Sequence, residues 1–171
     1  YKRQSVNRPF IIVEDGVIKK LQPPTTEIFH SKNMETIFVY GFEPNLNWYE
    51  FVDGIVNLTK KFEVKKFYSL GGLIDYIREP RISGLVTSEK LRKVLVDLGV
   101  ELVNYRGPSS IYSLLLNEIG KLNIEAVSLW GHVPYKNYLT SSQLEIPDTL
   151  TAYQLLEKFS LLTKIKLDLD E

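Results

Sequence analysis

The sequence predicts an α/β fold with three layers, in which helices cover both faces of a mixed, mostly parallel β-sheet. Apolar residues recur at helical spacing in four segments of the chain, and short apolar runs typical of strands separate these segments. A regular alternation of strand and helix is typical of a parallel sheet. Ligands of such sheets bind beyond the carboxyl ends of the strands.

The N-terminal part is expected to be rich in strands. Residues 9–13 and 17–21 are short apolar runs on either side of Asp15-Gly16, and this pair favours a hairpin turn. Residues 27–30 and 34–41 read as two further strands, the second of which starts the alternation of strands and helices. The hairpin region is expected to add antiparallel strands, which makes the sheet mixed.

Four helices are predicted from apolar stripes that recur every three or four residues. Thr87 or Ser88 can cap the second helix, and Gly99 can end it with a left-handed backbone. Asn123 can end the third helix in the same way. The stripes begin at Trp48, Leu91, Ile111 and Leu155.

Three further strands are predicted at residues 64–72, 101–105 and 125–130. The first is expected to end at Gly71-Gly72, in a tight turn that leads into a loop held open by Pro80. The last is expected to end at Gly131 and to lead into a loop that contains His132, Pro134, Tyr135 and Tyr138. These loops mark the candidate functional edge of the sheet.

The composition excludes several classes of protein. At 171 residues with 44% hydrophobic residues, the chain is long enough for one α/β domain, expected over 1–171. Its 21 basic residues equal its 21 acidic ones, so no net field attracts nucleic acid or an anionic membrane. The absence of cysteine excludes disulfides and thiolate metal sites. With no apolar span or targeting segment in the sequence, we expect a cytoplasmic protein.

No residue is predicted to be catalytic, to bind a cofactor or to hold a metal. His30 and His132 have no partner at metal-ligand spacing. His132 could act as a general base, but no Gly-x-Ser-x-Gly motif supplies a nucleophile. Arg106 precedes Ser109 and Ser110 and could help to hold an anion, although helix capping explains the serines. Asp75, Arg78, Glu79 and Arg81 could be an acid–base set or a solvated charge cluster.

The aromatic residues after the strand at 125–130 indicate an interaction loop instead. Trp130, Tyr135 and Tyr138 offer large, partly polar surface, and Pro134 limits the freedom of the backbone between them. This composition is typical of the residues that anchor protein interfaces. Packing of Trp130 in the core explains that residue equally well.

Three segments in order carry a resemblance to a known family: GGLIDYIREPRISGLVTSEKL, LVNYRGPSSIYSLLLNEIGKLNIEAVSLWGHVPYKNY and a last helix followed by KIKLDLD. From about Phe10 onward, the chain resembles the proteasome assembly chaperones of the second eukaryotic type and their archaeal homologues. The resemblance implies a three-layer α/β/α fold similar to nucleoside phosphorylases and hydrolases, and an archaeal source. Some relatives carry an ATP-grasp label, but the phosphate-binding elements of that class are missing here.

The resemblance also implies partners. Eukaryotic members help the α-subunits of the 20S proteasome to form a ring, and archaeal members self-associate and are linked to the proteasome. The glycine-rich first strand of the family would precede Tyr1, and Leu169-Asp170-Glu171 does not match the hydrophobic-Tyr-any-residue tail of archaeal members. We therefore expect the chain to lack its native N-terminal strand and C-terminal tail.

The sequence thus predicts a non-enzymatic, self-associating proteasome assembly chaperone that binds 20S α-subunits or the α-ring, without cofactor, nucleic acid or membrane. One alternative is a phosphorylase-like, hydrolase-like or ATP-dependent enzyme whose site combines Gly71, Arg81, Arg106 and His132. Another is a structural homo-oligomer with no proteasome role. The candidate residues for interaction lie at the strand ends: Gly71, Gly72, Arg81, Arg106, Trp130, Gly131, His132, Pro134, Tyr135 and Tyr138.

Overall fold

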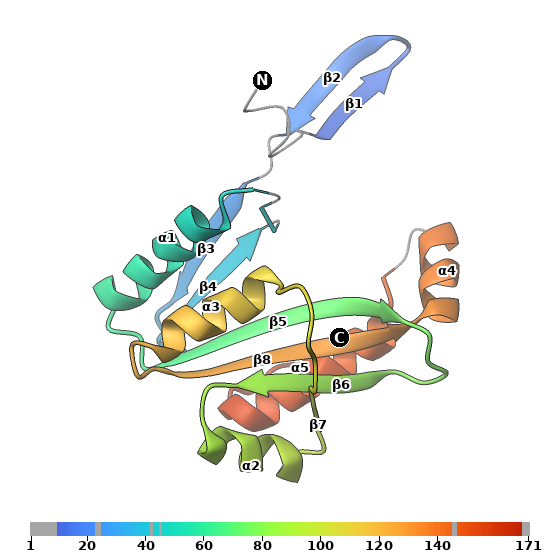
Figure 1. The fold of residues 1–171 in the computed structure, drawn as a ribbon. Coiled ribbons are helices and arrows are strands. Elements are labelled where there is room, and N and C mark those ends of the chain that lie inside the picture. Colours follow the sequence, from blue (N-terminus) through green and yellow to red (C-terminus); the bar gives the residue numbers. More distant parts are fainter. Residues whose placement is uncertain (1–9, 23–24, 42, 45, 145–146, 169–171) are drawn as a thin grey trace. The chain divides into compact units, whose positions relative to one another are not determined.

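The structure is a computed structural model, which describes residues 10–22, 25–41, 43–44, 46–144 and 147–168. The chain forms two compact units, Tyr1–Ile55 and Val56–Glu171 (Figure 1). The expectation of one α/β domain over 1–171 stays a prediction. None of the described helices has the length and apolar character needed to cross a membrane.

The first unit contains two antiparallel hairpins. β1 (Phe10–Glu14) pairs with β2 (Val17–Gln22) and β3 (Thr26–Ser31) with β4 (Thr36–Gly41). Asp15 and Gly16 have φ angles of 49° and 75°, and positive values at both positions are what a type I′ hairpin turn requires. The hairpin predicted at this turn is confirmed.

These hairpins correct one expectation about the sheet. Each hairpin forms a two-stranded sheet of its own in the described part of the chain. Neither hairpin adds strands to the main sheet, which has four strands and belongs to the second unit. The segment at 34–41 therefore does not begin a strand–helix alternation within that sheet. α1 (Trp48–Lys61), the predicted first helix, follows the second hairpin, and the Trp48 Nε1–H donates to the carbonyl of Pro44 at 2.5 Å.

The second unit is built on a mixed sheet in the order β5 (Lys66–Asp75), β8 (Glu125–Pro134), β6 (Arg81–Val86) and β7 (Glu101–Leu102). β5 and β8 are parallel, β6 is antiparallel to β8, and β6 and β7 are parallel. The predicted mixed α/β fold is confirmed. The strand β6, however, lies where the sequence predicted an irregular connection, and it is β6 that makes this sheet mixed.

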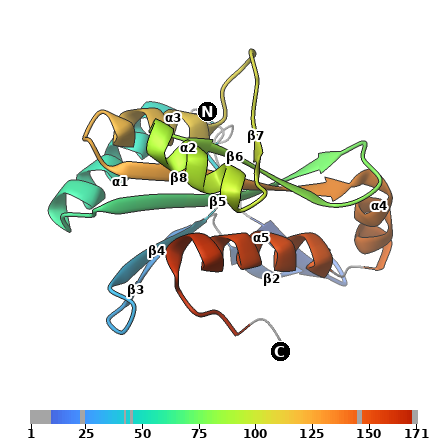
Figure 2. The same ribbon diagram turned by 90° about the horizontal axis from the view of Figure 1, so that it is seen from below.

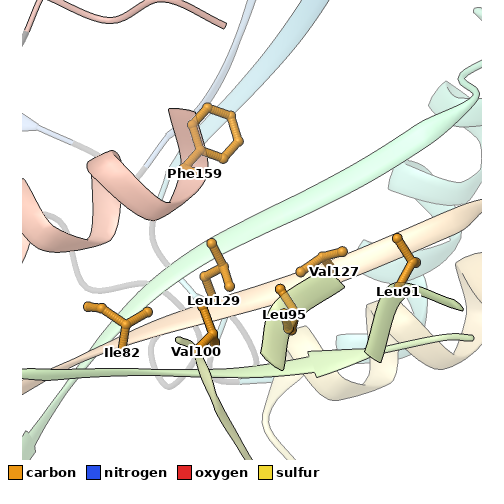
Figure 3. Close-up of a cluster of buried hydrophobic side chains, with 7 residues drawn as sticks. All are labelled: Ile82, Leu91, Leu95, Val100, Val127, Leu129 and Phe159. Atoms are coloured by element: carbon orange, nitrogen blue, oxygen red, sulfur yellow. The ribbon is translucent and has the colours of Figure 1, made fainter. Parts of the chain in front are cut away.

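Helices cover both faces of this sheet, as the three-layer prediction requires. Figure 2 shows α5 (Thr149–Thr163) on one side of the strands and α3 (Ile111–Gly120) on the other. On the α5 face, Leu129 of β8 belongs to a buried cluster with Leu95 of α2 (Glu89–Asp97) and Phe159 of α5 (Figure 3). On the opposite face, Ala126 of β8 packs in a cluster with Leu116 and Ile119 of α3. The alternation along β8 thus divides the core into two layers.

The helix ends follow the signals in the sequence. The Ser88 hydroxyl accepts a hydrogen bond from the Leu91 N–H at 3.3 Å and caps α2, and Ser110 caps α3 through the Ser113 N–H at 3.3 Å. Gly99 and Asn123 follow these helices with φ angles of 69° and 57°. These boundary predictions are confirmed, because side-chain acceptors and left-handed residues act within one helical turn.

The two strands that were expected to end at glycines run further than the sequence predicted. β5 continues through Gly71-Gly72 to Asp75, and β8 continues through Gly131 to Pro134. Pro134 is tolerated because β6 begins opposite His132, so among the described strands β8 pairs only with β5 beyond that point. The residues that follow form α4 (Tyr135–Leu144). The expected turn at Gly71-Gly72 and the expected loop after Gly131 are therefore both wrong.

Candidate functional site

The candidate site lies where three strands of the second unit meet at one edge of the sheet. The parallel strands β5 and β8 end at this edge, and the antiparallel β6 begins there, next to α4 (Figure 1). Arg81 lies opposite His132, and Ser83 lies opposite Trp130. Residues opposite each other in adjacent strands share a face. The pairing thus gathers polar side chains from distant parts of the chain on one face, the same face that α3 covers further along.

His132 is at the centre of this polar group, which we call the histidine network: His132, Asp75, Ser83, Arg81 and Glu101. The Nδ1 atom of His132 lies 2.9 Å from Oδ2 of Asp75, and its Nε2 atom lies 2.7 Å from Oγ of Ser83. The exposed fractions are only 8% for His132 and 4% for Ser83. Each of these buried polar groups has a hydrogen-bond partner, which offsets the free-energy cost of removing it from water.

Arg81 extends the network to the next strand. One guanidinium nitrogen donates to Oδ2 of Asp75 at 3.0 Å, and the other donates to both carboxylate oxygens of Glu101 at 2.8 and 2.6 Å. Hydrogen bonds from His132 and then from Arg81 hold the pKa of Asp75 below its ordinary value. The Asp75 carboxyl group therefore stays ionised and serves as an acceptor only.

That acceptor fixes which ring nitrogen of His132 carries the proton. An ionised carboxylate cannot donate a hydrogen bond, so in the neutral form of His132 it is Nδ1 that carries the proton and donates to Asp75. The Nε2 atom is then unprotonated and accepts the hydroxyl proton of Ser83. The arrangement can pull a proton from a serine hydroxyl, which is the task of a general base.

Trp130 lies beside the network and explains one of the two glycines of β5. Gly71 is opposite Trp130, and a Cβ at residue 71 would lie 3.1 Å from two carbons of the indole ring. The indole ring of Trp130 also packs edge-on against the ring of Tyr112 in α3, with 5.1 Å between the centroids. A Cβ at Gly72 would meet its nearest atom only at 3.8 Å. Gly71 thus makes room for the indole, whereas Gly72 has no such constraint.

A group of exposed rings lies beyond the network at the same edge. Tyr76, which follows β5, and Tyr135 of α4 have ring centroids 4.9 Å apart, and Tyr135 and Tyr138 have centroids 6.4 Å apart. Their exposed fractions are 87%, 38% and 41% for Tyr76, Tyr135 and Tyr138. We call these three residues the tyrosine cluster.

The structure brings together most of the residues that the sequence singled out. Arg81 and His132 join the histidine network, with Trp130 and Gly71 beside it. Gly131 faces the other way, since a Cβ there would lie 2.8 Å from a side-chain carbon of Thr151 in α5. Arg106 is exposed between β7 and α3 and takes part in none of the ion pairs of the described residues.

The sequence did not predict the roles of four residues. The sequence pattern singles out neither Ser83 nor Glu101, does not group Tyr76 with the other tyrosines, and leaves Asp75 as part of an acid–base set or a surface charge cluster. No local sequence signal connects a hydroxyl with His132, but the Ser83 hydroxyl lies within hydrogen-bonding distance of its Nε2 atom. The available signal for a strand is the alternation of Arg81, Ile82 and Ser83, followed by apolar Leu85-Val86. No three potential metal ligands gather within the described ranges.

The fold and the site define a class: three-layer α/β proteins with a polar network at the carboxyl edge of a mixed sheet. Comparison with known families gives the class its name. The model of the PAC2 family matches residues 2–171, and the chain belongs to this family. No curated protein sequence matches the chain significantly.

Solved structures of similar fold agree with this family. A PAC2 family protein from Streptomyces avermitilis has a TM-score of 0.72 and 22% identity, over 95% of this chain and 68% of its own. Pyrococcus furiosus PbaA, an archaeal homolog of proteasome-assembly chaperone, has a TM-score of 0.69 and 20% identity. The match covers 95% of this chain and 63% of PbaA. PbaB from the same organism, an archaeal proteasome activator, has a TM-score of 0.63 and 19% identity. The match covers 94% of this chain and 70% of PbaB.

Proposed function

We propose that this chain is a proteasome assembly chaperone-like protein that binds 20S proteasome α-subunits or the α-ring. Membership of the PAC2 family supports a chaperone-like role. The descriptions of PbaA and PbaB, which share the fold, support the proteasome as the partner. A proteasome partner also supports the cytoplasm as the place of action, and we include self-association in the proposal.

The tyrosine cluster is the observation that supports the position of the proposed binding surface. Tyr76, Tyr135 and Tyr138 keep large exposed fractions although their rings lie beside one another. Rigid aromatic side chains lose little conformational entropy on binding and bury a large area, so they often dominate the binding energy of an interface. Pro134, the last residue of β8, is fully buried immediately before α4, which anchors the helix that carries two of these rings.

This surface differs in detail from the one that the sequence suggested. Tyr135 and Tyr138 lie on a helix, so their spacing of three residues places both rings on one side of α4. Tyr76 reaches the same place from the end of β5. Trp130, Gly131 and His132 belong to β8 and are not part of the cluster.

The test is a double substitution, Tyr135→Ala with Tyr138→Ala. We expect the variant to remain folded and to bind purified proteasome α-subunits at least tenfold more weakly, because loss of an aromatic anchor costs about 2 kcal/mol or more. Binding would be measured by co-purification and by titration, and self-association by size-exclusion chromatography with light scattering.

Tyr153→Ala is the matched control, because Tyr153 of α5 is exposed to a similar degree, 43%. This variant should bind and associate like the parent chain. A double variant that binds α-subunits with parental affinity would contradict the assigned surface. A parent chain that self-associates but captures no α-subunit would instead favour the structural homo-oligomer.

A further inference from the structure

We propose that Ser83 is an activated nucleophile that accepts acyl groups from small esters, with His132 as the general base and Asp75 as the group that orients it. This activity goes beyond the proposed binding function and uses different residues. The tyrosine cluster is on the surface, whereas the Ser83 hydroxyl lies inside the histidine network.

The order of contacts is the first support for this role. A serine is activated when its hydroxyl bonds to one nitrogen of an imidazole whose other nitrogen bonds to a carboxylate. Ser83 contacts Nε2 of His132 at 2.7 Å, and Asp75 contacts Nδ1 at 2.9 Å. Both contacts are short enough to transfer a proton or to hold the ring in place.

The carboxylate of Asp75 is itself held in position. Arg81 donates to the same Oδ2 atom that accepts from His132, and Glu101 holds the other side of the guanidinium. Asp75 and Arg81 lie on either side of the turn between β5 and β6, so the chain itself keeps them close. The imidazole is therefore oriented by a network that spans β5, β6 and β7.

The reaction follows from this geometry. The Ser83 Oγ attacks the carbonyl carbon of the ester while its proton passes to Nε2 of His132. The bond between the carbonyl carbon and the alkoxy oxygen then breaks, and the leaving alcohol takes the proton from Nε2. The products are acyl-Ser83 and a free alcohol, and water activated by the same nitrogen can later remove the acyl group as a carboxylic acid.

Burial restricts the class of acyl donor. Only 4% of the surface of Ser83 and 8% of that of His132 is exposed, so a bulky acyl group cannot reach the hydroxyl. Acetyl is the smallest acyl group with an alkyl substituent on its carbonyl carbon. A small, activated acetyl ester is therefore the probe of choice.

A second buried serine pair gives a comparison within the same sheet. Ser69 of β5 and Ser128 of β8 share a hydrogen bond of 2.8 Å, and both are buried. No imidazole takes part in that contact, so the pair satisfies its hydroxyls without activating them. Ser69, at 7% exposed, matches Ser83 in burial but not in chemistry.

The experiment uses the absence of cysteine from the sequence. Ser83→Cys introduces a single thiol beside His132, and its rate of alkylation by iodoacetamide is measured at pH 6.5 and pH 8.5. An ordinary thiol has a pKa of about 8.5 and loses reactivity about tenfold per pH unit below it. The ratio of the two rates cancels differences in accessibility, since the same site is compared with itself.

We expect Ser83→Cys to keep most of its reactivity at pH 6.5, because the imidazole takes the thiol proton. Addition of His132→Asn should lower that reactivity about tenfold or more, and Ser69→Cys should behave as an ordinary thiol. The ratio of the alkylation rates at pH 6.5 and pH 8.5 decides the proposal. If this ratio is equal for Ser83→Cys and Ser69→Cys, or if His132→Asn leaves it unchanged in Ser83→Cys, activation by His132 is overturned.

A second measurement needs no cysteine variant. The parent chain is incubated with vinyl acetate, an activated acetyl ester with a small leaving group, and analysed by peptide mass spectrometry. We expect an acetyl group on the peptide that holds Ser83, and its loss in Ser83→Ala but not in Ser69→Ala. A parent chain without acetylated Ser83 would overturn the role as acyl acceptor even if the thiol variant is activated.

Discussion

At the scale of single residues, Asp75 links the chemistry of the site to the stability of the fold. Its carboxylate accepts from His132 and Arg81, and these bonds lower its pKa in the folded chain. A carboxyl group with a lower pKa in the folded state stabilises that state while it is ionised. The contribution is complete above the pKa of the unfolded chain, about 3.9, and is lost as the pH falls through the lower folded value.

This sign leads to a prediction for Asp75→Asn. The variant should be less stable than the parent near neutral pH, and the difference in free energy of unfolding should shrink below about pH 4. Urea unfolding at several pH values between 7 and 3 would measure it. Asp97→Asn, a change at an exposed carboxyl of α2, serves as the control and should show no such trend. A pH-independent deficit for Asp75→Asn would contradict the linkage.

At the scale of elements, α2 shows that the spacing of apolar residues predicts which side of a helix is buried. Leu95 is fully buried in the cluster that contains Leu129 and Phe159, whereas its neighbour Val96 is 52% exposed. The predicted stripe through Leu91 and Leu95 is therefore confirmed as the buried side of this helix.

The same pair of neighbours provides a stability test. Leu95→Ala should lower the free energy of unfolding by about 2 to 5 kcal/mol, because it removes apolar contacts and leaves a cavity. Val96→Ala should change it by no more than about 0.5 kcal/mol, as is usual on the surface. Denaturant unfolding curves give both values, and equal effects of the two substitutions would show that the helix faces another way.

Sequence patterns predicted the ends of helices better than the ends of strands in this chain, for a physical reason. Helix caps and stripes act between residues three or four apart, so Ser88, Ser110 and Gly99 could be interpreted locally. A glycine inside a strand depends on what lies across from it, and only the register shows that Gly71 faces the Trp130 ring. Likewise, Ser83 and His132 are 49 residues apart, and no local signal connects them.

At the scale of the whole molecule, charge balance and exposed apolar surface act together. The chain has as many acidic as basic residues, and its isoelectric point is about 7.0. Large apolar side chains of both hairpins are exposed, among them Phe10 at 66% and Phe29 at 52%. Without net charge, repulsion between molecules does not oppose contacts between such side chains.

We therefore expect self-association to be strongest near pH 7 and weaker at pH 5 and pH 9. Light scattering at fixed protein concentration and low salt would measure the average mass at each pH. High salt should reduce the pH dependence, because it screens the repulsion between charged molecules. A mass that is constant over this range, or lowest at pH 7, would show that net charge does not control association.

The position of β8 between β5 and β6 also has a consequence for synthesis of the chain. Asp75, Arg81 and Ser83 leave the ribosome well before His132, which follows Ser83 by 49 residues and Asp75 by 57. Until β8 is made, β5 and β6 lack the strand that lies between them in the sheet. Contacts between residues so far apart in sequence form late. Completion of the histidine network therefore coincides with the insertion of the central strand, and the serine acquires its base only once the sheet is assembled.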